Sequence, residues 1–397
     1  MPHNTPPDLR SGSYLIQAQE RVIFGQAADA AVAAEADRYG ARRVFVVSTR
    51  SLDRLENGPL QRVIAALGSR HTGTYAAVRA HSPREDVVAA ANAAREARAD
   101  LLIAVGGGSV IDATKAVQLC LWLGVDTPES MEPYRNGAAA DIARKIDPPA
   151  TPIRMVAVST TLSASEFTSQ VGVTDTKIGA KQSFAHRLLV PRSVILDPAA
   201  TIETPHWLLF CTGIRAVDHA VEAYCSPLAN PATDGSALQG LRLLYRSLPR
   251  IEADPSDLNA RLDAQFGMWQ AIAAAAAGAG SGASHGIGYV LGATFGVAHG
   301  HTSCVMLPAV LRWNVTANGE RQRALSEAMA APDRPAADLI AELIARLDQP
   351  DSLRAVNIKR ENLDEIAERA MTYAPVRMNP RPIKSPADVK EILELAW

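Results

Sequence analysis

The strongest constraint on the fold is a short aliphatic run that passes directly into three glycines. Residues 101–105 read LLIAV, a pattern typical of a strand that is buried on both faces. The motif VGGGSVIDATK at 105–115 continues from it and has the composition of a helix start. A strand that turns through glycine into a helix is the first half of a strand–helix–strand unit, whose strands run parallel. The motif therefore predicts a parallel sheet with helices on its faces.

Neighbouring segments extend this alternation of strands and helices. Aliphatic runs at 41–49 and 153–160 predict two further buried strands, and apolar residues at helical spacing over 84–100 predict the helix before LLIAV. An edge pair of strands is expected between residues 170 and 196. Together these segments describe an α/β domain.

The pattern changes near residue 198, after which strand signals almost vanish and helical spacing continues to Trp397. We therefore expect an α/β domain over residues 1–198, an all-helical domain over 199–397, and a ligand site in the cleft between them. The Ala- and Gly-rich run at 271–280 is too short and too weakly apolar to cross a membrane. It predicts a closely packed, buried helix.

Composition limits the partners of the chain. The 397 residues include 40 Lys and Arg against 42 Asp and Glu, so no positive field is available for nucleic acid or an anionic membrane. The four cysteines are scattered without a Cys-x-x-Cys pair, and the N-terminus lacks the apolar core of a signal peptide. These features favour a cytoplasmic protein whose ligand is a small molecule.

The three glycines also indicate an anion site. Gly106, Gly107 and Gly108 allow the backbone to approach a bound group closely, and the free N–H groups of the following helix start attract negative charge. A diphosphate is the expected ligand. The pattern differs from the Gly-x-Gly-x-x-Gly dinucleotide motif, and such a turn also occurs for purely structural reasons. Its position after a buried strand favours the binding interpretation.

Further motifs carry a family resemblance. The chain resembles the iron-containing (group III) alcohol dehydrogenase family in GGGSVIDATK, STTLSASEFT at 159–168, ILDPAATIETP at 195–205, GIRAVDHAVEAY at 213–224 and ASHGIGYVLGATFGVAHGH at 283–301. The segment MNPRPI at 378–383 is similar to the end of the maleylacetate reductase branch. The resemblance implies the dehydroquinate synthase-like fold of that family, with an N-terminal dinucleotide-binding domain, NAD or NADP as cofactor, and a homodimer.

The resemblance also implies which residues contact the cofactor. Asp112 and Lys115 are expected to face the nicotinamide ribose, with an exposed ion pair one helical turn apart as an equal alternative. Arg50 stands at a strand end where a carboxylate would favour NAD, so the choice between NAD and NADP stays open. The other implied contacts are Gly106, Gly107, Gly108 and Ser109 at the diphosphate, Thr160, Thr161 and Ser163 beyond it, and Ser48 and Thr49 near the adenosine.

One position departs from the metal site of this family. Metal-dependent members place an aspartate four residues before a histidine and add two later histidines, and here His219, His285 and His299 fill the histidine positions. Arg215 occupies the aspartate position, where a guanidinium has no lone pair and repels a cation. Asp218 is expected to point about 100° away from His219 on the helix, which makes it a poor replacement. We therefore expect no metal, with a rearranged site in which Arg215 swings out as the alternative.

The maleylacetate reductase branch also lacks that aspartate and is taken to work without a metal. Its substrate is a dianion, and Arg215 is expected to bind one carboxylate where other members bind the metal. The structural alternative is that Arg215 pairs with Asp218 or Glu222 on its own helix. Arg215 is also expected to lower the pKa of His219 and keep that ring neutral. Tyr289 stands where many members have histidine, and its O–H suits proton donation in the reductive direction, with simple packing as the alternative.

These residues predict a metal-independent NAD(P)H-dependent reductase that acts on an unsaturated or oxo acid of the maleylacetate type, in aromatic compound catabolism. The candidate catalytic residues are Arg215, His219, His285, Tyr289 and His299, with the histidines as proton donors or carboxylate partners. Two alternatives stay open. One is an NAD(P)-dependent alcohol or aldehyde oxidoreductase with a different substrate, and the other is a non-redox lyase or nucleotide-binding pseudoenzyme.

Overall fold

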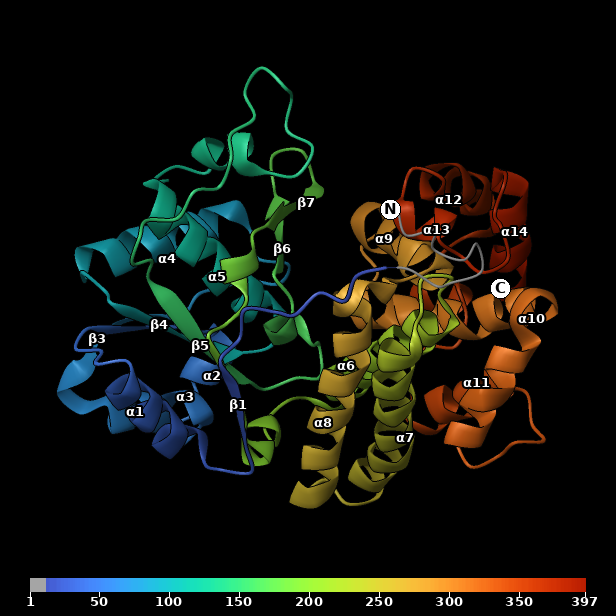
Figure 1. Cartoon of the computed structure of the whole chain (residues 1–397), viewed down its shortest axis with the longest axis horizontal. Coiled ribbons are helices and arrows are strands. Elements are labelled where there is room, and N and C mark those ends of the chain that lie inside the picture. Colours follow the sequence, from blue (N-terminus) through green and yellow to red (C-terminus); the bar gives the residue numbers. More distant parts are fainter. Residues whose placement is uncertain (1–11) are drawn as a thin grey trace, which may run out of the picture.

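The chain folds into two lobes that lie side by side (Figure 1). The structure is a computed structural model and describes residues 12–397. One lobe contains a six-stranded sheet that ends at Leu196, and the other begins with the long helix α6 (His206–Cys225) and is built from helices. The predicted combination of an α/β lobe and a helical lobe is confirmed.

Every neighbouring pair of strands in the main sheet is parallel, as the sequence predicts. The strands are β1 (Arg21–Phe24), β2 (Val44–Val47), β3 (His71–Tyr75), β4 (Leu101–Gly106), β5 (Arg154–Ser159) and β8 (Ser193–Leu196). Their order is β1-β8-β5-β4-β2-β3, so β4 and its glycine motif lie in the middle of the sheet. The carboxyl ends of β4 and β5 meet at one edge, where Gly106 pairs with Ser159.

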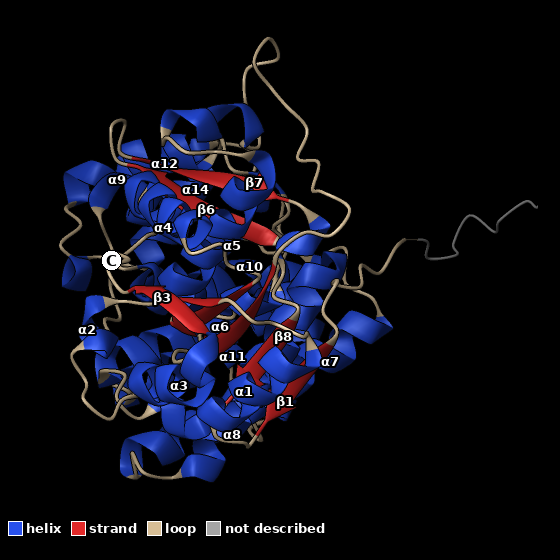
Figure 2. Ribbon diagram, turned by 90° about the vertical axis from the view of Figure 1, so that its left-hand side faces the viewer, coloured by secondary structure: helices blue, strands red, loops and turns tan. Residues whose placement is uncertain are grey.

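Helices cover both faces of this sheet (Figure 2) because its central strands are apolar on both sides. Val46 of β2 belongs to the core of one face, and Val47 belongs to the core of the other. The helices are α1 (Ala28–Arg38) and α3 (Pro59–Leu67) on the first face, α4 (Arg84–Glu96) and α5 (Gly108–Leu123) on the second, and the single turn α2 (Arg50–Asp53) after β2.

The segment between residues 170 and 196 corrects the prediction of an edge pair. Strands β6 (Gln170–Asp175) and β7 (Ala180–Ala185) pair with each other as an antiparallel hairpin in a separate sheet. Strand β8 lies inside the main sheet, between β1 and β5. Local periodicity cannot reveal this arrangement, because one partner of β8 is the first strand of the chain. Residues Val171 and Phe184 of the hairpin pack in the same core as α5.

The helical lobe continues to the C-terminus, as predicted. Within residues 12–397, none of the helices combines the length and the apolar character needed to cross a membrane. Its further helices are α7 (Pro231–Ala253), α8 (Leu258–Ala274), α9 (Ala283–Phe295), α10 (His299–Ala328), α11 (Ala336–Arg346), α12 (Leu363–Ala370), α13 (Ala374–Arg377) and α14 (Pro386–Leu395).

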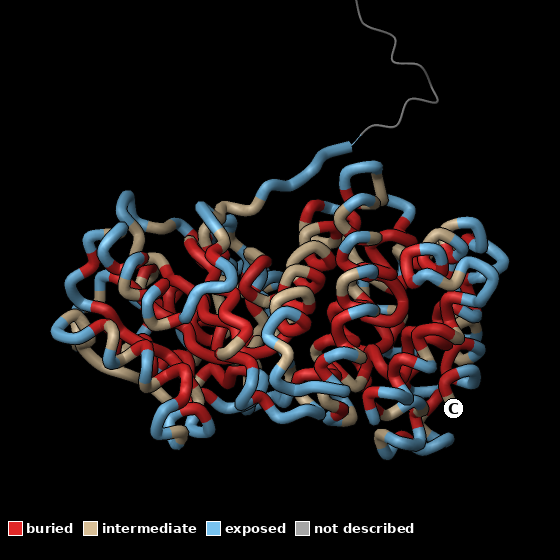
Figure 3. The backbone as a smooth tube through the Cα atoms, turned by 90° about the horizontal axis from the view of Figure 1, so that it is seen from below, coloured by how far each residue is buried: buried red, intermediate tan, exposed pale blue. Residues whose placement is uncertain are grey.

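A shared core joins the two lobes. Figure 3 shows buried residues throughout both of them. Leu162, Phe167 and Leu196 of the sheet lobe are buried in the same apolar cluster as helices α6, α7 and α8. Arg261 of α8 is only 2% exposed and donates hydrogen bonds to the carbonyl oxygen of Thr201 at 2.9 Å and to its hydroxyl at 2.8 Å. Separating the lobes would expose this core to water, so their contact is part of the fold.

The Ala- and Gly-rich run at 271–280 is not one regular buried helix, which corrects the prediction. Helix α8 ends at Ala274, and Ala275–Ala279 form a π-helical turn in which Gly278 has a φ of +124° and is exposed. The backbone N–H of Leu15 donates to the carbonyl oxygen of Ala277 at 2.9 Å. Ala277 lies in the last turn before the helix ends, where carbonyl groups lack partners within the helix, and its carbonyl fastens the N-terminal segment to the helical lobe.

We expect Gly240→Val to destabilise the fold, because α7 and α8 approach each other closely at this residue. A Cβ atom at Gly240 would lie 2.6 Å from the backbone nitrogen of Ala271. Helix backbone cannot move aside easily, so the free energy of unfolding should fall by about 1–3 kcal/mol. Thermal denaturation measures the change. The matched control is Gly235→Ala on the same helix, where nothing lies within 4 Å of the added atom. Equal melting temperatures for the two variants would contradict this account.

Candidate active site

The glycine motif leaves the start of α5 open to a ligand. Gly107 is the N-cap residue, no side chain caps the helix, and its first turn contains no acidic residue. The backbone N–H of Thr160 donates to the carbonyl oxygen of Gly106 at 3.1 Å, which holds the loop after β5 beside the motif. The N–H groups of Gly108 and Ser109 and the positive end of the helix dipole are therefore available to an anion, whereas the N–H of Val110 donates to the carbonyl oxygen of Gly107 at 3.0 Å.

Residues 160–163 pack directly against the glycines. A Cβ atom on Gly107 would lie 2.7 Å from Thr161 Cγ2, and one on Gly108 would lie 2.9 Å from Ser163 Oγ. Any larger residue would therefore displace these side chains. The hydroxyls of Thr161 and Ser163 are buried and have no hydrogen-bond partner within residues 12–397. Unpartnered hydroxyls beside an open helix start fit the diphosphate of a nicotinamide dinucleotide.

The family resemblance assigned three other residues to the cofactor, and their side chains have hydrogen-bond partners inside the protein. Ser48 Oγ donates to the carbonyl oxygen of Val105 at 2.8 Å and ties β2 to β4. Ser109 Oγ accepts a hydrogen bond from the backbone N–H of His81 at 3.0 Å. Thr49 caps the short helix α2. The hydroxyl of Ser48 is therefore committed to the fold of the sheet.

Asp112 and Lys115 do not form an exposed ion pair, which corrects that interpretation. Lys115 is fully buried, and its Nζ donates to the carbonyl oxygens of Ser165 at 2.6 Å and Gln170 at 2.9 Å. Its Nζ also lies 3.6 Å from Asp112 Oδ1, while Asp112 Oδ2 accepts from the backbone N–H of Gly172 at 3.2 Å. The pair fastens α5 to the hairpin, and the donors of Lys115 are used inside the protein.

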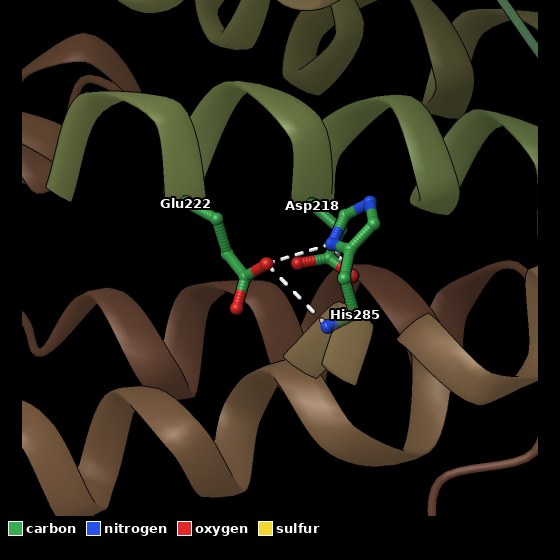
Figure 4. A group of neighbouring side chains, drawn as sticks. All are labelled: Asp218, Glu222 and His285. Atoms are coloured by element: carbon green, nitrogen blue, oxygen red, sulfur yellow. Dashed lines mark hydrogen bonds and ion pairs between the residues drawn. The ribbon is translucent and has the colours of Figure 1, made fainter. Parts of the chain in front are cut away.

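One side of α6 carries four polar residues that face α9. Asp218, His219 and Glu222 follow Arg215 by three, four and seven residues, so all four side chains project from the same side of the helix. Helix α9 contributes His285 opposite them (Figure 4). Water is largely excluded, because Arg215 is 4% exposed, Asp218 0% and His285 2%.

Short contacts link Glu222, His285 and His219 in series. Glu222 Oε2 lies 2.7 Å from His285 Nδ1, and His285 Nε2 lies 3.0 Å from His219 Nδ1. Glu222 also accepts hydrogen bonds from the backbone N–H groups of Gly282 and Ser284, both at 2.7 Å, where α9 begins. The carboxylate therefore caps α9 and holds the ring of His285 at the same time.

Asp218 belongs to this group, which corrects the expectation that it points away from the site. Its Oδ2 lies 3.4 Å from His285 Nδ1 and accepts hydrogen bonds from the hydroxyls of Ser284 at 2.8 Å and Ser303 at 2.6 Å. Arg215 Nη1 donates to Ser303 Oγ at 2.9 Å and lies 4.0 Å from Asp218 Oδ2. The expectation compared Asp218 with His219 alone, whereas on the helix both side chains project within about 60° of the direction of Arg215.

His219, Tyr289 and His299 form the solvent-accessible side of the group. His219 and Tyr289 are partly exposed and His299 is exposed, while Arg215 and His285 are buried behind them. The rings of Tyr289 and His299 are parallel with centroids 6.4 Å apart, and Tyr289 meets His285 edge-on at the same distance. The structure thus brings the five predicted catalytic residues into one group.

All three histidines have lowered pKa values. Burial is the main cause for His219, whose pKa lies well below its usual range, and for His285, whose pKa falls to about 3. The charge of Arg215 adds to both shifts and is the main cause of the lowered pKa of His299. These rings are therefore neutral at pH 7, which agrees with the expectation for His219.

The acidic groups shift in the opposite direction. Burial raises the pKa of Asp218 to about 6 and that of Glu222 to about 7, while the backbone N–H groups of α9 oppose the shift at Glu222. Burial also raises the pKa of Tyr289. Tyr289 therefore keeps its O–H throughout the neutral range.

Lys181 of β7 is a candidate that sequence reasoning missed. Its side chain is exposed, and its charge contributes to the lowered pKa values of His299 and His81. The hairpin of the sheet lobe thus brings a second positive charge near the solvent-accessible side of the group. No motif marks this lysine, because its proximity to His299 depends on how the two lobes pack.

The metal ligand set of the resembling family does not fit these residues. Arg215 replaces the aspartate with a cation, and His285 Nε2 faces His219. Asp218, Glu222 and His285 do offer three ligand atoms within 4.8 Å of one another. N–H and O–H donors already occupy both oxygens of Glu222 and Oδ2 of Asp218, whereas Asp218 Oδ1 has no hydrogen-bond partner within residues 12–397. The guanidinium of Arg215 lies 4.0 Å from Asp218 Oδ2, so a cation at the free oxygen would lie close to a second positive charge.

Comparison with known proteins identifies the family of the chain. A family model described as iron-containing alcohol dehydrogenase matches residues 19–198, and one described as the C-terminal part of the Fe-containing alcohol dehydrogenase family matches residues 210–397. The chain belongs to the iron-containing alcohol dehydrogenase family. As a member of that family it is an NAD(P)-dependent oxidoreductase.

Relatives of this alcohol dehydrogenase family member include reductases. The chain is 30% identical over 377 residues to a maleylacetate reductase of Pseudomonas sp. strain P51, with 95% of each chain covered. It is 32% identical over 385 residues to a dehydrogenase of Gibberella moniliformis, which covers 88% of this chain and 90% of that protein.

Solved structures of a maleylacetate reductase and of a protein described as an alcohol dehydrogenase are also similar to this chain. The maleylacetate reductase of Rhizobium sp. strain MTP-10005 has a TM-score of 0.81 and 27% identity, with 98% of this chain and 99% of that chain covered. A structure described as an alcohol dehydrogenase of Ralstonia eutropha JMP134 has a TM-score of 0.83 and 30% identity, with 98% of each chain covered.

We expect Glu166→Gln to stabilise the protein at neutral and alkaline pH. Glu166 is completely buried, its carboxylate oxygens have no hydrogen-bond partner in the described chain, and burial raises its pKa to about 7. The folded state therefore binds this proton more tightly than the unfolded state, so the free energy of unfolding falls as the pH rises from the ordinary pKa towards the raised one.

Removing the charge should therefore recover stability on the order of 3 kcal/mol at pH 8 and almost none at pH 4.5. Urea denaturation of the wild type and Glu166→Gln at both pH values measures the difference. An equal gain at the two pH values would show that the substitution acts through packing and not through the proton.

Proposed function

We propose that this family member is a metal-independent NAD(P)H-dependent reductase that acts on an unsaturated or oxo acid of the maleylacetate type, in aromatic compound catabolism. The observation that carries the proposal is the buried cation Arg215, which stands at the aspartate position of the family. Its positive charge lowers the pKa values of His219, His285 and His299. Maleylacetate reductases among the relatives support the substrate class.

The glycine motif is the proposed cofactor site. The backbone of residues 106–109 would bind the diphosphate at the start of α5, with the hydroxyls of Thr161 and Ser163 as further donors. The nicotinamide, when bound, supplies the hydride. Arg50 is exposed at the end of β2, near the proposed adenosine position, so it is available to the additional phosphate of NADP. We therefore propose NAD or NADP as the cofactor.

Two positive charges support recognition of a dianionic acid. Arg215 provides one charge behind His299, and Lys181 provides a second from the opposite lobe. A dianion would be attracted by both charges, whereas a neutral aldehyde would gain little from either. Ser303 and Asp218 hold Arg215, so its position is fixed before a substrate arrives. The substrate therefore does not have to order this side chain on binding.

Reduction also requires a proton, for which Tyr289 is the proposed donor. Burial raises the pKa of its phenol, so the O–H is retained at neutral pH. The ring lies parallel to that of His299 on the solvent-accessible side. The neutral rings of His219 and His299 each carry one N–H donor and one nitrogen acceptor, and they can orient a bound acid.

A second candidate is an NAD(P)-dependent alcohol or aldehyde oxidoreductase with a different substrate. The dehydrogenase of Gibberella moniliformis and the Ralstonia eutropha structure, described as an alcohol dehydrogenase, favour this candidate. A non-redox lyase or pseudoenzyme has no such support, because the chain belongs to a family of oxidoreductases.

We further propose a cytoplasmic homodimer that binds neither nucleic acid nor membranes. The four cysteines are buried and unpaired, which supports a reducing compartment. The net charge of -2 supports the absence of a polyanionic partner. Light scattering during size-exclusion chromatography tests the dimer.

Turnover in the absence of metal is the deciding experiment. Chelator-treated protein, with its metal content measured in the same sample, should oxidise NADH or NADPH in the presence of maleylacetate, and added Fe²⁺ or Zn²⁺ should not increase the rate. Aldehyde reduction that appears only after metal is added would contradict the proposal. That result would support the second candidate, since a Lewis acid assists such chemistry.

Variants of the two cations test the substrate class. Arg215→Met keeps most of the side-chain volume and should raise the KM for maleylacetate by about 10- to 100-fold, as expected for loss of a charged hydrogen-bond partner. Lys181→Met should raise it by less than about tenfold, because the lysine is exposed. The KM for the nicotinamide cofactor and for a neutral aldehyde should stay unchanged. Equal effects on the dianion and the aldehyde would speak against charge recognition.

A further inference from the structure

Glu222, His285 and His219 form a hydrogen-bonded series. The contacts of Glu222, at its buried end, decide which atom donates in each hydrogen bond. Glu222 accepts from the backbone N–H of Ser284 at Oε1 and from that of Gly282 at Oε2, both at 2.7 Å. The N–H of His285 approaches Oε2 at 3.4 Å as a third backbone donor. These groups are the open N–H groups at the start of α9, which favour an ionised carboxylate. At pH 8, above its raised pKa of about 7, Glu222 is therefore ionised and accepts every contact that it makes in this group.

The hydrogen bond between Glu222 and His285 must then be donated by the histidine. A second carboxylate agrees, because Asp218 Oδ2 also lies on the Nδ1 side of the ring, at 3.4 Å. At pH 8 an imidazole of ordinary pKa is already neutral, and burial lowers the pKa of His285 further, so its ring carries only one N–H. Its Nε2 is therefore a lone pair, and the contact at 3.0 Å must be donated by Nδ1–H of His219.

We propose that Glu222 is a positioning residue that fixes both His285 and His219 as Nδ1–H tautomers, so that Nε2 of His219 is a hydrogen-bond acceptor for the substrate. His219 is the partly exposed member of the series, and Arg215, one helical turn before it, adds positive charge to the same face of α6. The acceptor is therefore suited to a hydroxyl of the ligand, such as the enol O–H of an oxo acid, and not to a carboxylate. This use of the acceptor rests on the proposed function, whereas the tautomers themselves do not.

The other groups packed against the series are consistent with this direction. Ser284 and Ser303 donate their hydroxyl protons to Asp218, so neither competes for a ring nitrogen of His285. Arg215 is a donor only and cannot accept the proton of His219. The rings of His219 and His285 lie with their centroids 4.6 Å apart, which leaves no room for a side chain between them.

Nitrogen NMR of histidine-labelled protein tests the proposal directly. In the absence of substrate at pH 8, the ¹⁵N–¹H correlation patterns of His219 and His285 should both be those of Nδ1–H tautomers, whereas free histidine favours Nε2–H. His219→Gln and His285→Gln assign the signals. An Nε2–H pattern for either ring in the wild type would overturn the proposal, and this outcome requires no variant of Glu222 to fold.

Glu222→Gln then tests whether the carboxylate sets the direction. The amide can donate to His285 Nδ1, so the signals of both histidines should shift together towards the Nε2–H pattern, and kcat should fall by about 10- to 100-fold with little change in the KM for the cofactor. The matched control is Asp218→Asn, which removes a neighbouring buried carboxylate and should leave both rings as Nδ1–H.

A shift of His285 alone, or the same shift in Asp218→Asn, would refute the role assigned to Glu222. The spectra also separate this inference from the proposed function. Nδ1–H tautomers in a protein that is inactive with maleylacetate would support the inference and contradict the function, and Nε2–H tautomers in an active protein would do the reverse.

Discussion

Buried charge at the contact between α6 and α9 constrains the whole helical lobe. Arg215, Asp218 and Glu222 lie where water is almost absent, and an uncompensated charge there would cost about 3–5 kcal/mol. Each finds a partner on another helix: Ser303 of α10 serves both Arg215 and Asp218, and the backbone at the start of α9 serves Glu222. Helices α6, α9 and α10 must therefore meet in one relative position. The geometry of the candidate site is a consequence of that requirement.

The sequence predicts the fold well where elements that are neighbours in the chain are also neighbours in space. The run LLIAV and the glycines after it identify the central strand β4 and the helix α5, because both elements are adjacent in the chain. Strand β8 is different, since it lies between β5 and the N-terminal strand β1, and no short segment contains that information. The π-helical turn at Ala275–Ala279 was also not predicted, because alanine suits a regular helix equally well and no local pattern marks the turn.

For the candidate site, family motifs identified the residues but not their contacts. The family resemblance of two motifs implied Arg215, His219 and His285, and the structure brings these residues together. The interpretation of Asp218 failed because it used one neighbour on a helical wheel, whereas the position of α9 decides which side of α6 is the inner side. Lys181 could not be predicted, because its effect on the site arises from packing between the two lobes.

Arg215 keeps the formal charge of the family's metal site while changing its chemistry. A divalent cation bound to one aspartate has a net single positive charge, and a guanidinium has the same charge. An anionic substrate would therefore be attracted in a similar way by either arrangement. A guanidinium donates hydrogen bonds but cannot accept a lone pair, so it cannot acidify a bound alcohol as a Lewis acid does. In the reaction that we propose, the substitution would therefore favour substrates whose double bond or carbonyl is already polarised by neighbouring acid or oxo groups over simple alcohols.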